Sequence, residues 1–192
     1  MSLSRMGRTT PIPAPPMDEI SPLMIFAGLA VACTAIGVAG SALPSYAKAA
    51  LGVATAFAVL EVANELIPYP LIGAPHAAVA TVLFAAPSKP LQETALTVIG
   101  GHIIAVALAV LQVKFLPAAA AALVKTLVVA LSVGAQKATG TVHPPAVAMA
   151  FVWATTGNND PLKAIGPLIG CSVLIGVQQL WIVLTSSKAK IS

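Results

Sequence analysis

Long apolar stretches separated by short polar or proline-containing breaks run along most of the chain. Seven such segments follow one another, at about residues 22–43, 46–67, 75–86, 91–113, 118–138, 144–156 and 162–184. The apolar residues do not alternate with a period of two, as membrane β-strands require, so the pattern predicts helices. Five segments have the roughly 20 residues that a helix needs to cross a bilayer, whereas the third and the sixth are much shorter.

The two short segments share a second property, because each begins at a proline. Segment 75–86 has about 12 residues, and as a helix it would be roughly 18 Å long against a hydrocarbon thickness of about 30 Å. Proline is well suited to the first turn of a helix. Paired short helices at corresponding places of two halves are typical of the substrate sites of secondary transporters.

The segments also form an internal repeat. Three matches at offsets of 69 to 71 relate two units, about 46–114 and 117–185: Pro75-His76-Ala77 with Pro144-Pro145-Ala146, Pro90-Leu91 with Pro161-Leu162, and Ile99-Gly100 with Ile169-Gly170. We therefore predict an all-α membrane protein with one leading transmembrane helix and two pseudo-symmetric three-segment units, each with a short proline-started half-helix. The units are inverted if the short segments cross the membrane and parallel if they re-enter it, and the pattern leaves both open.

Composition agrees with a single membrane domain. The 192 residues are 58% hydrophobic and 8% charged, whereas a soluble domain has about 25% charged residues. The expected organisation is an exposed tail at 1–21, one transmembrane domain at 22–187 and a short tail at 188–192. The net charge of +4 comes from cations that occur singly, so we expect interface anchors and no nucleic-acid partner. The cations are spread too evenly over the two sides to set the orientation.

The starts of the two short segments are the predicted substrate site. The free N–H groups in the first turn of a helix and the positive end of its dipole bind anions. The candidates are the two proline-started turns and their neighbours: Thr141, His143, Pro144, Pro145, Ala146 and Val147 in one, and Pro75, His76 and Ala77 in the other.

Ionisable side chains inside apolar segments are functional candidates by default. We predict proton coupling through His143, His102, Glu61 and Glu65. Histidine exchanges protons near neutral pH, and the two glutamates lie one turn apart on one helix face, so that one of them should hold a proton. The alternatives are structural hydrogen bonds for the histidines and a solvated interface position for Glu65.

Lys125 is a further binding candidate. It shares one helical stripe with Ser132, Gln136 and Thr139, and such a stripe would line a polar path while the lysine raises the local anion concentration. The alternative is a lysine that extends its amine to the interface beside small hydrogen-bonding residues.

Three stretches resemble the HPP family of small integral membrane proteins. They are GAPHAAVATVLFAAPSKPL, VIGGH and TVHPPAVAMAF, the last of which contains the tripeptide His143-Pro144-Pro145 that names the family. The resemblance covers about residues 50–184. Members from cyanobacteria and chloroplasts are linked to nitrite transport. The resemblance therefore implies nitrite transport across a bacterial plasma membrane or, alternatively, a chloroplast envelope.

The sequence thus favours a secondary transporter in the lipid bilayer that moves a small monovalent inorganic anion, above all nitrite, together with protons. Nitrate, formate and bicarbonate would suit a helix-terminus site equally well. A passive channel without proton coupling is the main alternative, and a scaffold is the third. The sequence contains no enzyme motif, no cofactor motif and no metal-ligand spacing. It leaves the oligomeric state open, a homo-oligomer included.

Overall fold

The computed structural model describes residues 43–67, 73–85, 89–116, 121–158 and 160–186, and every regular element within these ranges is helical. The leading segment expected at 22–43, apart from its last residue, and both tails lie outside the described residues. The elements are α2 (Ser45–Leu66), α3 (Ala74–Ala85), α4 (Leu91–Ala95), a π-helical turn η2 (Leu96–Gly100), α5 (Gly101–Phe115), α6 (Ala121–Thr139), α7 (Pro144–Thr156), a 3₁₀ turn η4 (Pro161–Ala164) and α8 (Ile165–Ser186). The predicted helical class is confirmed.

The long helices differ in how well they suit a bilayer. Among the described helices, Ser45–Leu66, Leu91–Phe115 and Pro161–Thr185 are long and apolar enough to cross a membrane. The 19-residue α6 had been expected to span as well but is not among them, and it carries Lys125 and Lys137. The short helices α3 and α7 have 12 and 13 residues, as the sequence predicts.

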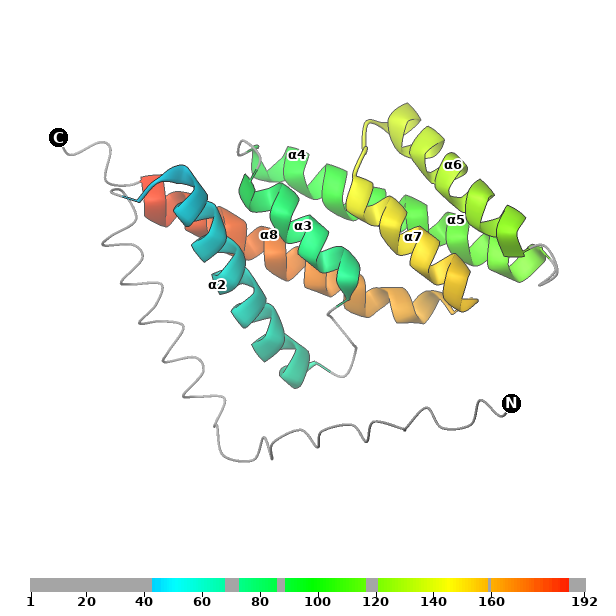
Figure 1. Cartoon of the computed structure of the whole chain (residues 1–192), viewed down its shortest axis with the longest axis horizontal. Coiled ribbons are helices and arrows are strands. Elements are labelled where there is room, and N and C mark those ends of the chain that lie inside the picture. Colours follow the sequence, from blue (N-terminus) through cyan, green and yellow to red (C-terminus); the bar gives the residue numbers. More distant parts are fainter. Residues whose placement is uncertain (1–42, 68–72, 86–88, 117–120, 159, 187–192) are drawn as a thin grey trace, which may run out of the picture.

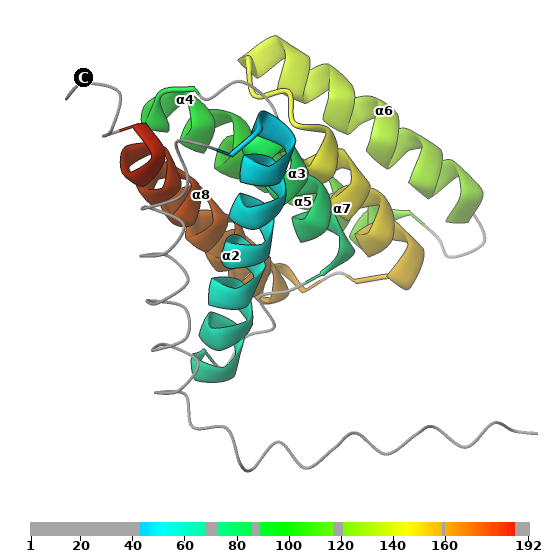
Figure 2. The same ribbon diagram turned by 60° about the vertical axis from the view of Figure 1, so that its left-hand side comes forward.

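Packing divides the helices into two groups of three (Figure 1). In one group α2, α3 and α8 contact one another, and in the other α5, α6 and α7 do so. Figure 2 shows α6 at the outer side of the second group, next to α7. Each short helix therefore packs against one long helix of its own repeat unit and one of the other unit. Two pseudo-symmetric units would produce this correspondence, although the repeat itself and its orientation stay predictions.

Each group has its own apolar core. One buried cluster includes Leu60 of α2 and Leu174 of α8, and the other includes Val128 of α6 and Met149 of α7. The α3 and α7 helices also contact each other, so the short helices join the two groups. The contact between α3 and α7 is therefore one of the places where the two groups meet.

The outer face of the Leu91–Phe115 helix is apolar. Leu96, Ile103 and Leu111 recur at helical spacing and each keeps half or more of its surface exposed. A stripe of large exposed apolar side chains is unfavourable in water, but lipid tails solvate it well. This face therefore fits a bilayer.

Candidate functional site

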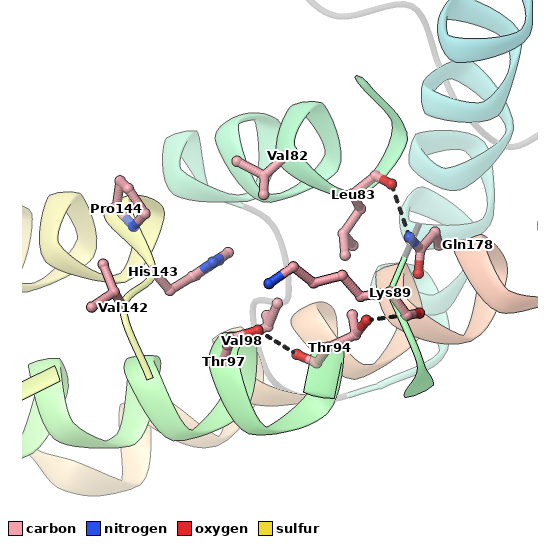
Figure 3. A pocket seen from close by; sticks show the side chains of 10 residues that line it. All are labelled: Val82, Leu83, Lys89, Thr94, Thr97, Val98, Val142, His143, Pro144 and Gln178. Atoms are coloured by element: carbon pink, nitrogen blue, oxygen red, sulfur yellow. Dashed lines mark hydrogen bonds between the residues drawn. The ribbon is translucent and has the colours of Figure 1, made fainter. Parts of the chain in front are cut away.

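A cavity of about 110 Å³ lies beside the start of α7 (Figure 3). Its polar lining consists of Lys89, Thr94, Thr97, His143 and Gln178. Because one water takes up about 30 Å³, the cavity has room for a small ion and one or two waters.

The cavity runs from an exposed mouth to a buried end. Lys89 precedes α4 and its side chain is 55% exposed, whereas His143 is only 2% exposed. Val98, which also lines the cavity, lies about 10 Å along the helix from Leu91. Figure 3 shows the side chains of Lys89 and His143 pointing toward each other across the space. The site therefore places a cation at the mouth and an imidazole at the inner end.

The chain reaches His143 through a tight helix end. Gly140 has φ +70°, the left-handed conformation that glycine adopts without strain. The N–H groups of Thr141 and Gly140 donate to the carbonyls of Gln136 at 2.9 Å and Lys137 at 3.4 Å, which is the Schellman pattern. This ending of α6 lets α7 begin at Pro144, directly after the histidine.

The backbone of His143 is anchored by a buried glutamine. The His143 N–H donates to Oε1 of Gln136 at 2.8 Å, and Nε2 of Gln136 donates to the Gly101 carbonyl at 3.1 Å. The ring of His143 has no such anchor at Nε2. This nitrogen is buried and has no hydrogen-bond partner within the described part of the chain. Nearly all buried polar atoms in proteins have a partner, so this nitrogen is suited to meet a water or a solute.

Two glycines allow the start of α7 to approach α5 closely. A Cβ atom on Gly101 would lie 2.8 Å from the Thr141 carbonyl oxygen and 2.9 Å from Cβ of His143. A Cβ atom on Gly100 would lie 3.2 Å from the Thr141 side chain. The π-helical turn η2 ends at Gly100, and such turns are frequent at functional sites because they redirect the side chains around them.

His102 lies next to His143, as two predicted proton carriers should. Their ring centroids are 5.3 Å apart, and His102 is fully buried. Nδ1 of His102 lies 2.7 Å from the Val98 carbonyl oxygen and therefore carries a hydrogen that it donates. Its Nε2 faces the free thiol of Cys171 at 3.7 Å. Within the described ranges, no three His, Cys, Asp or Glu side chains gather in a way that could hold a metal ion.

The comparisons with known proteins agree with this membrane architecture. The family model described as HPP, transmembrane region, matches residues 39–189. The chain belongs to the HPP family. A search of the curated proteins and a search of the solved structures find no match. With its three long apolar helices, this HPP chain is an integral membrane protein, and its family suggests a membrane transport or channel role.

His76, at the other short helix of the HPP domain, makes structural contacts with both ring nitrogens. Nδ1 accepts a hydrogen bond from the Gly73 N–H at 3.0 Å, and Nε2 donates to the Pro167 carbonyl at 3.1 Å. The residue is 1% exposed. These bonds hold the start of α3 on α8. The structural alternative therefore accounts for His76, and neither it nor its neighbours Pro75 and Ala77 line the cavity.

Two of the backbone donors predicted at the helix starts, those of His76 and Ala146, already have partners. The His76 N–H donates to the Gly73 carbonyl at 2.9 Å, and the Ala146 N–H donates to the His143 carbonyl at 3.0 Å. Pro144 lines the cavity, but Pro145, Ala146 and Val147 do not. The polar groups around the HPP cavity thus belong mainly to side chains, and the binding site proposed below lies there.

The remaining predicted residues lie elsewhere in the HPP domain. Thr141 is buried against Gly100, with its Oγ1 2.8 Å from that of Thr139. Lys125 is half-buried on α6, and Glu61 and Glu65 are exposed on α2. None of these four predicted residues lines the cavity.

Lys89, Thr94, Thr97 and Gln178 are the polar cavity residues that the sequence analysis did not identify. Lys89 was grouped with the interface anchors because cations commonly flank membrane helices. A usable signal existed, since Lys89 and Glu93 are four residues apart and Thr94 and Thr97 are three apart at the start of an apolar helix. Polar residues on adjoining turns of such a helix indicate a polar face there.

Proposed function

We propose that this HPP protein is a secondary transporter that moves a small monovalent inorganic anion, above all nitrite, together with protons. The observation that carries the proposal is the cavity lined by Lys89 and His143, together with the buried Nε2 of His143, which has no partner among the described residues. A cation attracts an anion, and an imidazole nitrogen can both accept and donate a proton. The two groups required for anion–proton coupling thus face one small space.

The transport step follows from the order of these groups. An anion that enters past Lys89 reaches the threonine hydroxyls, which are polar but uncharged. At the inner end, protonated His143 donates from Nε2 to the anion and can transfer its proton. A protonated or closely paired anion carries little net charge, so it costs far less to move through an apolar interior than the bare ion.

His102 is the group through which His143 exchanges its proton with the rest of the molecule. The ring centroids are 5.3 Å apart, with the rings tilted by 52°, so a ring rotation would suffice to bring two of their nitrogens into hydrogen-bond contact. Glu61 and Glu65 are exposed on α2 and do not line the cavity. The proposal therefore places coupling at the histidine pair and not at Glu61 or Glu65.

The substrate class rests on two arguments of different kinds. The cavity volume and the single lysine suit a small ion of one charge. The choice of nitrite comes from the resemblance to HPP members of cyanobacteria and chloroplasts, which also suggests a plasma membrane or chloroplast envelope as the site of action. Nitrate, formate and bicarbonate fit the same cavity and serve as competitors in the test.

The test is nitrite uptake by the purified protein in liposomes with an imposed pH gradient. We expect nitrite to accumulate above its external concentration when the outside is acidic, and accumulation to stop when an ionophore collapses the gradient. Protein-free vesicles correct for nitrous acid that crosses lipid unaided. Flux that follows only the nitrite gradient would identify a passive channel, and flux equal to that of empty vesicles would indicate a non-transport role.

A further inference from the structure

We propose that Glu93 is a built-in competitor for the transported anion, which must displace the Glu93 carboxylate from Lys89 in order to bind. This inference rests on the proposed function. Nζ of Lys89 lies 2.6 Å from Oε1 of Glu93. Lys89 lines the cavity but Glu93 does not, so the carboxylate engages the cation of the site from outside it.

The ion pair is weak enough to be exchanged. The two side chains are 55% and 50% exposed, and ion pairs between such exposed groups contribute little to stability. An incoming anion meets the same ammonium and, at the inner end of the cavity, His143. The hydroxyl groups of Thr94 and Thr97 donate to backbone carbonyls, so the contact that the anion gains over Glu93 is the one with His143.

Glu93 also has a favourable place after it is displaced. Its side chain is half-exposed, so water solvates the released carboxylate. It stands in the first turn of α4, where the positive end of the helix dipole stabilises a negative charge. Breaking the pair therefore leaves neither charge buried and unpaired.

The exchange has a consequence for selectivity. Before binding, one carboxylate neutralises Lys89, and after binding, one monovalent anion does so. While His143 is neutral, a divalent anion would leave an excess negative charge next to Thr94 and the apolar Val98. The single charge of Lys89 therefore favours monovalent anions at this first step of binding, which is the class that the proposed function requires.

The experiment measures the KM for nitrite uptake in liposomes for Glu93→Gln, Lys89→Gln and the double variant. Removing the competitor should lower the KM by up to about five-fold, the factor that corresponds to an exposed ion pair of about 1 kcal/mol. Lys89→Gln should raise the KM, and Glu93→Gln should change nothing further in that background. Glu93→Ala should reproduce the shift of Glu93→Gln, and Lys114→Gln, at the far end of the same helical stretch, is the charge-matched control.

Two results would overturn the inference alone while wild-type flux stands. One is an unchanged KM in both Glu93 variants. The other is an equal drop in KM with and without Lys89, which would mean that Glu93 repels anions generally and does not compete for the lysine. Absence of nitrite flux in the wild type would overturn the proposed function and this inference together.

Discussion

The two short helices begin with similar sequences but have different surroundings. At the start of α3, both ring nitrogens of His76 are bonded to backbone groups, one of them on α8. At the start of α7, Gln136 accepts a hydrogen bond from the His143 N–H, and Nε2 of the His143 ring has no partner among the residues that the structure describes. The ring of His76 thus anchors the start of α3, whereas at the start of α7 the backbone of His143 is the anchor and its ring nitrogen Nε2 is available to a solute.

The largest effect on nitrite transport is expected from a substitution of His143. His143→Gln keeps a polar side chain but removes the exchangeable proton, so the initial rate of nitrite uptake driven by a pH gradient should fall about 100-fold. The melting temperature should change little, because Nε2 makes no hydrogen bond to the described residues. Uptake in liposomes and thermal unfolding measure the two quantities. A wild-type rate of uptake in this variant would remove His143 from the mechanism.

A substitution of His76 is expected to lower the stability of the protein and to leave transport unchanged. His76→Ala deprives the Gly73 N–H and the Pro167 carbonyl of their partner, which should cost about 3 kcal/mol and lower the melting temperature by roughly 6–12 °C. The KM for nitrite should stay unchanged in the protein that remains folded. A His76→Ala variant with the wild-type melting temperature and an altered KM would contradict the purely structural role of His76.

The close approach of α7 to α5 predicts a smaller effect. Gly101→Ala places a Cβ atom 2.8 Å from the Thr141 carbonyl oxygen, so we expect a loss of about 1–3 kcal/mol and a higher KM as His143 moves. Gly134→Ala is the matched control, because a Cβ atom there meets nothing within 4 Å and should be neutral or stabilise the protein by up to about 1 kcal/mol. Thermal unfolding of both variants checks the difference. Equal effects at the two positions would contradict the tight contact at Gly101.

The smallest effect is expected at Lys125, which lies on α6 away from the cavity lining. Lys125→Gln should leave the initial rate of nitrite uptake within about two-fold of wild type, since a distant cation contributes only screened attraction. A ten-fold loss would mean that the polar stripe along α6 belongs to the transport path and that the site extends beyond the region around α7.

Apolar length was enough to predict the helices and their approximate ends. The two short segments and the breaks at proline follow from local chemistry, and α7 coincides with its predicted range of 144–156. The proximity of His102 and His143 agrees with their shared predicted role. The span expected at 118–138 is less apolar than the other long helices.

The composition of the site could not be predicted, because it depends on which segments pack together. Helix-start chemistry pointed to backbone donors at Ala146 and His76, but the turns preceding them already supply carbonyl partners. Lys89 is separated from His143 by more than 50 residues and meets it only across the packed helices. The different surroundings of His76 and His143 likewise arise from tertiary contacts to α8 and to Gln136, which no local pattern reveals.

The most direct test of the account is the location of a bound monovalent anion. Crystals soaked in sodium bromide would show the ion by its anomalous scattering. We predict a peak between Nζ of Lys89 and Nε2 of His143, which is lost in the Lys89→Gln variant. A peak at the backbone N–H groups in the first turn of α3 or α7, with the cavity free of bromide, would contradict the account. It would show that the anion binds at the helix starts.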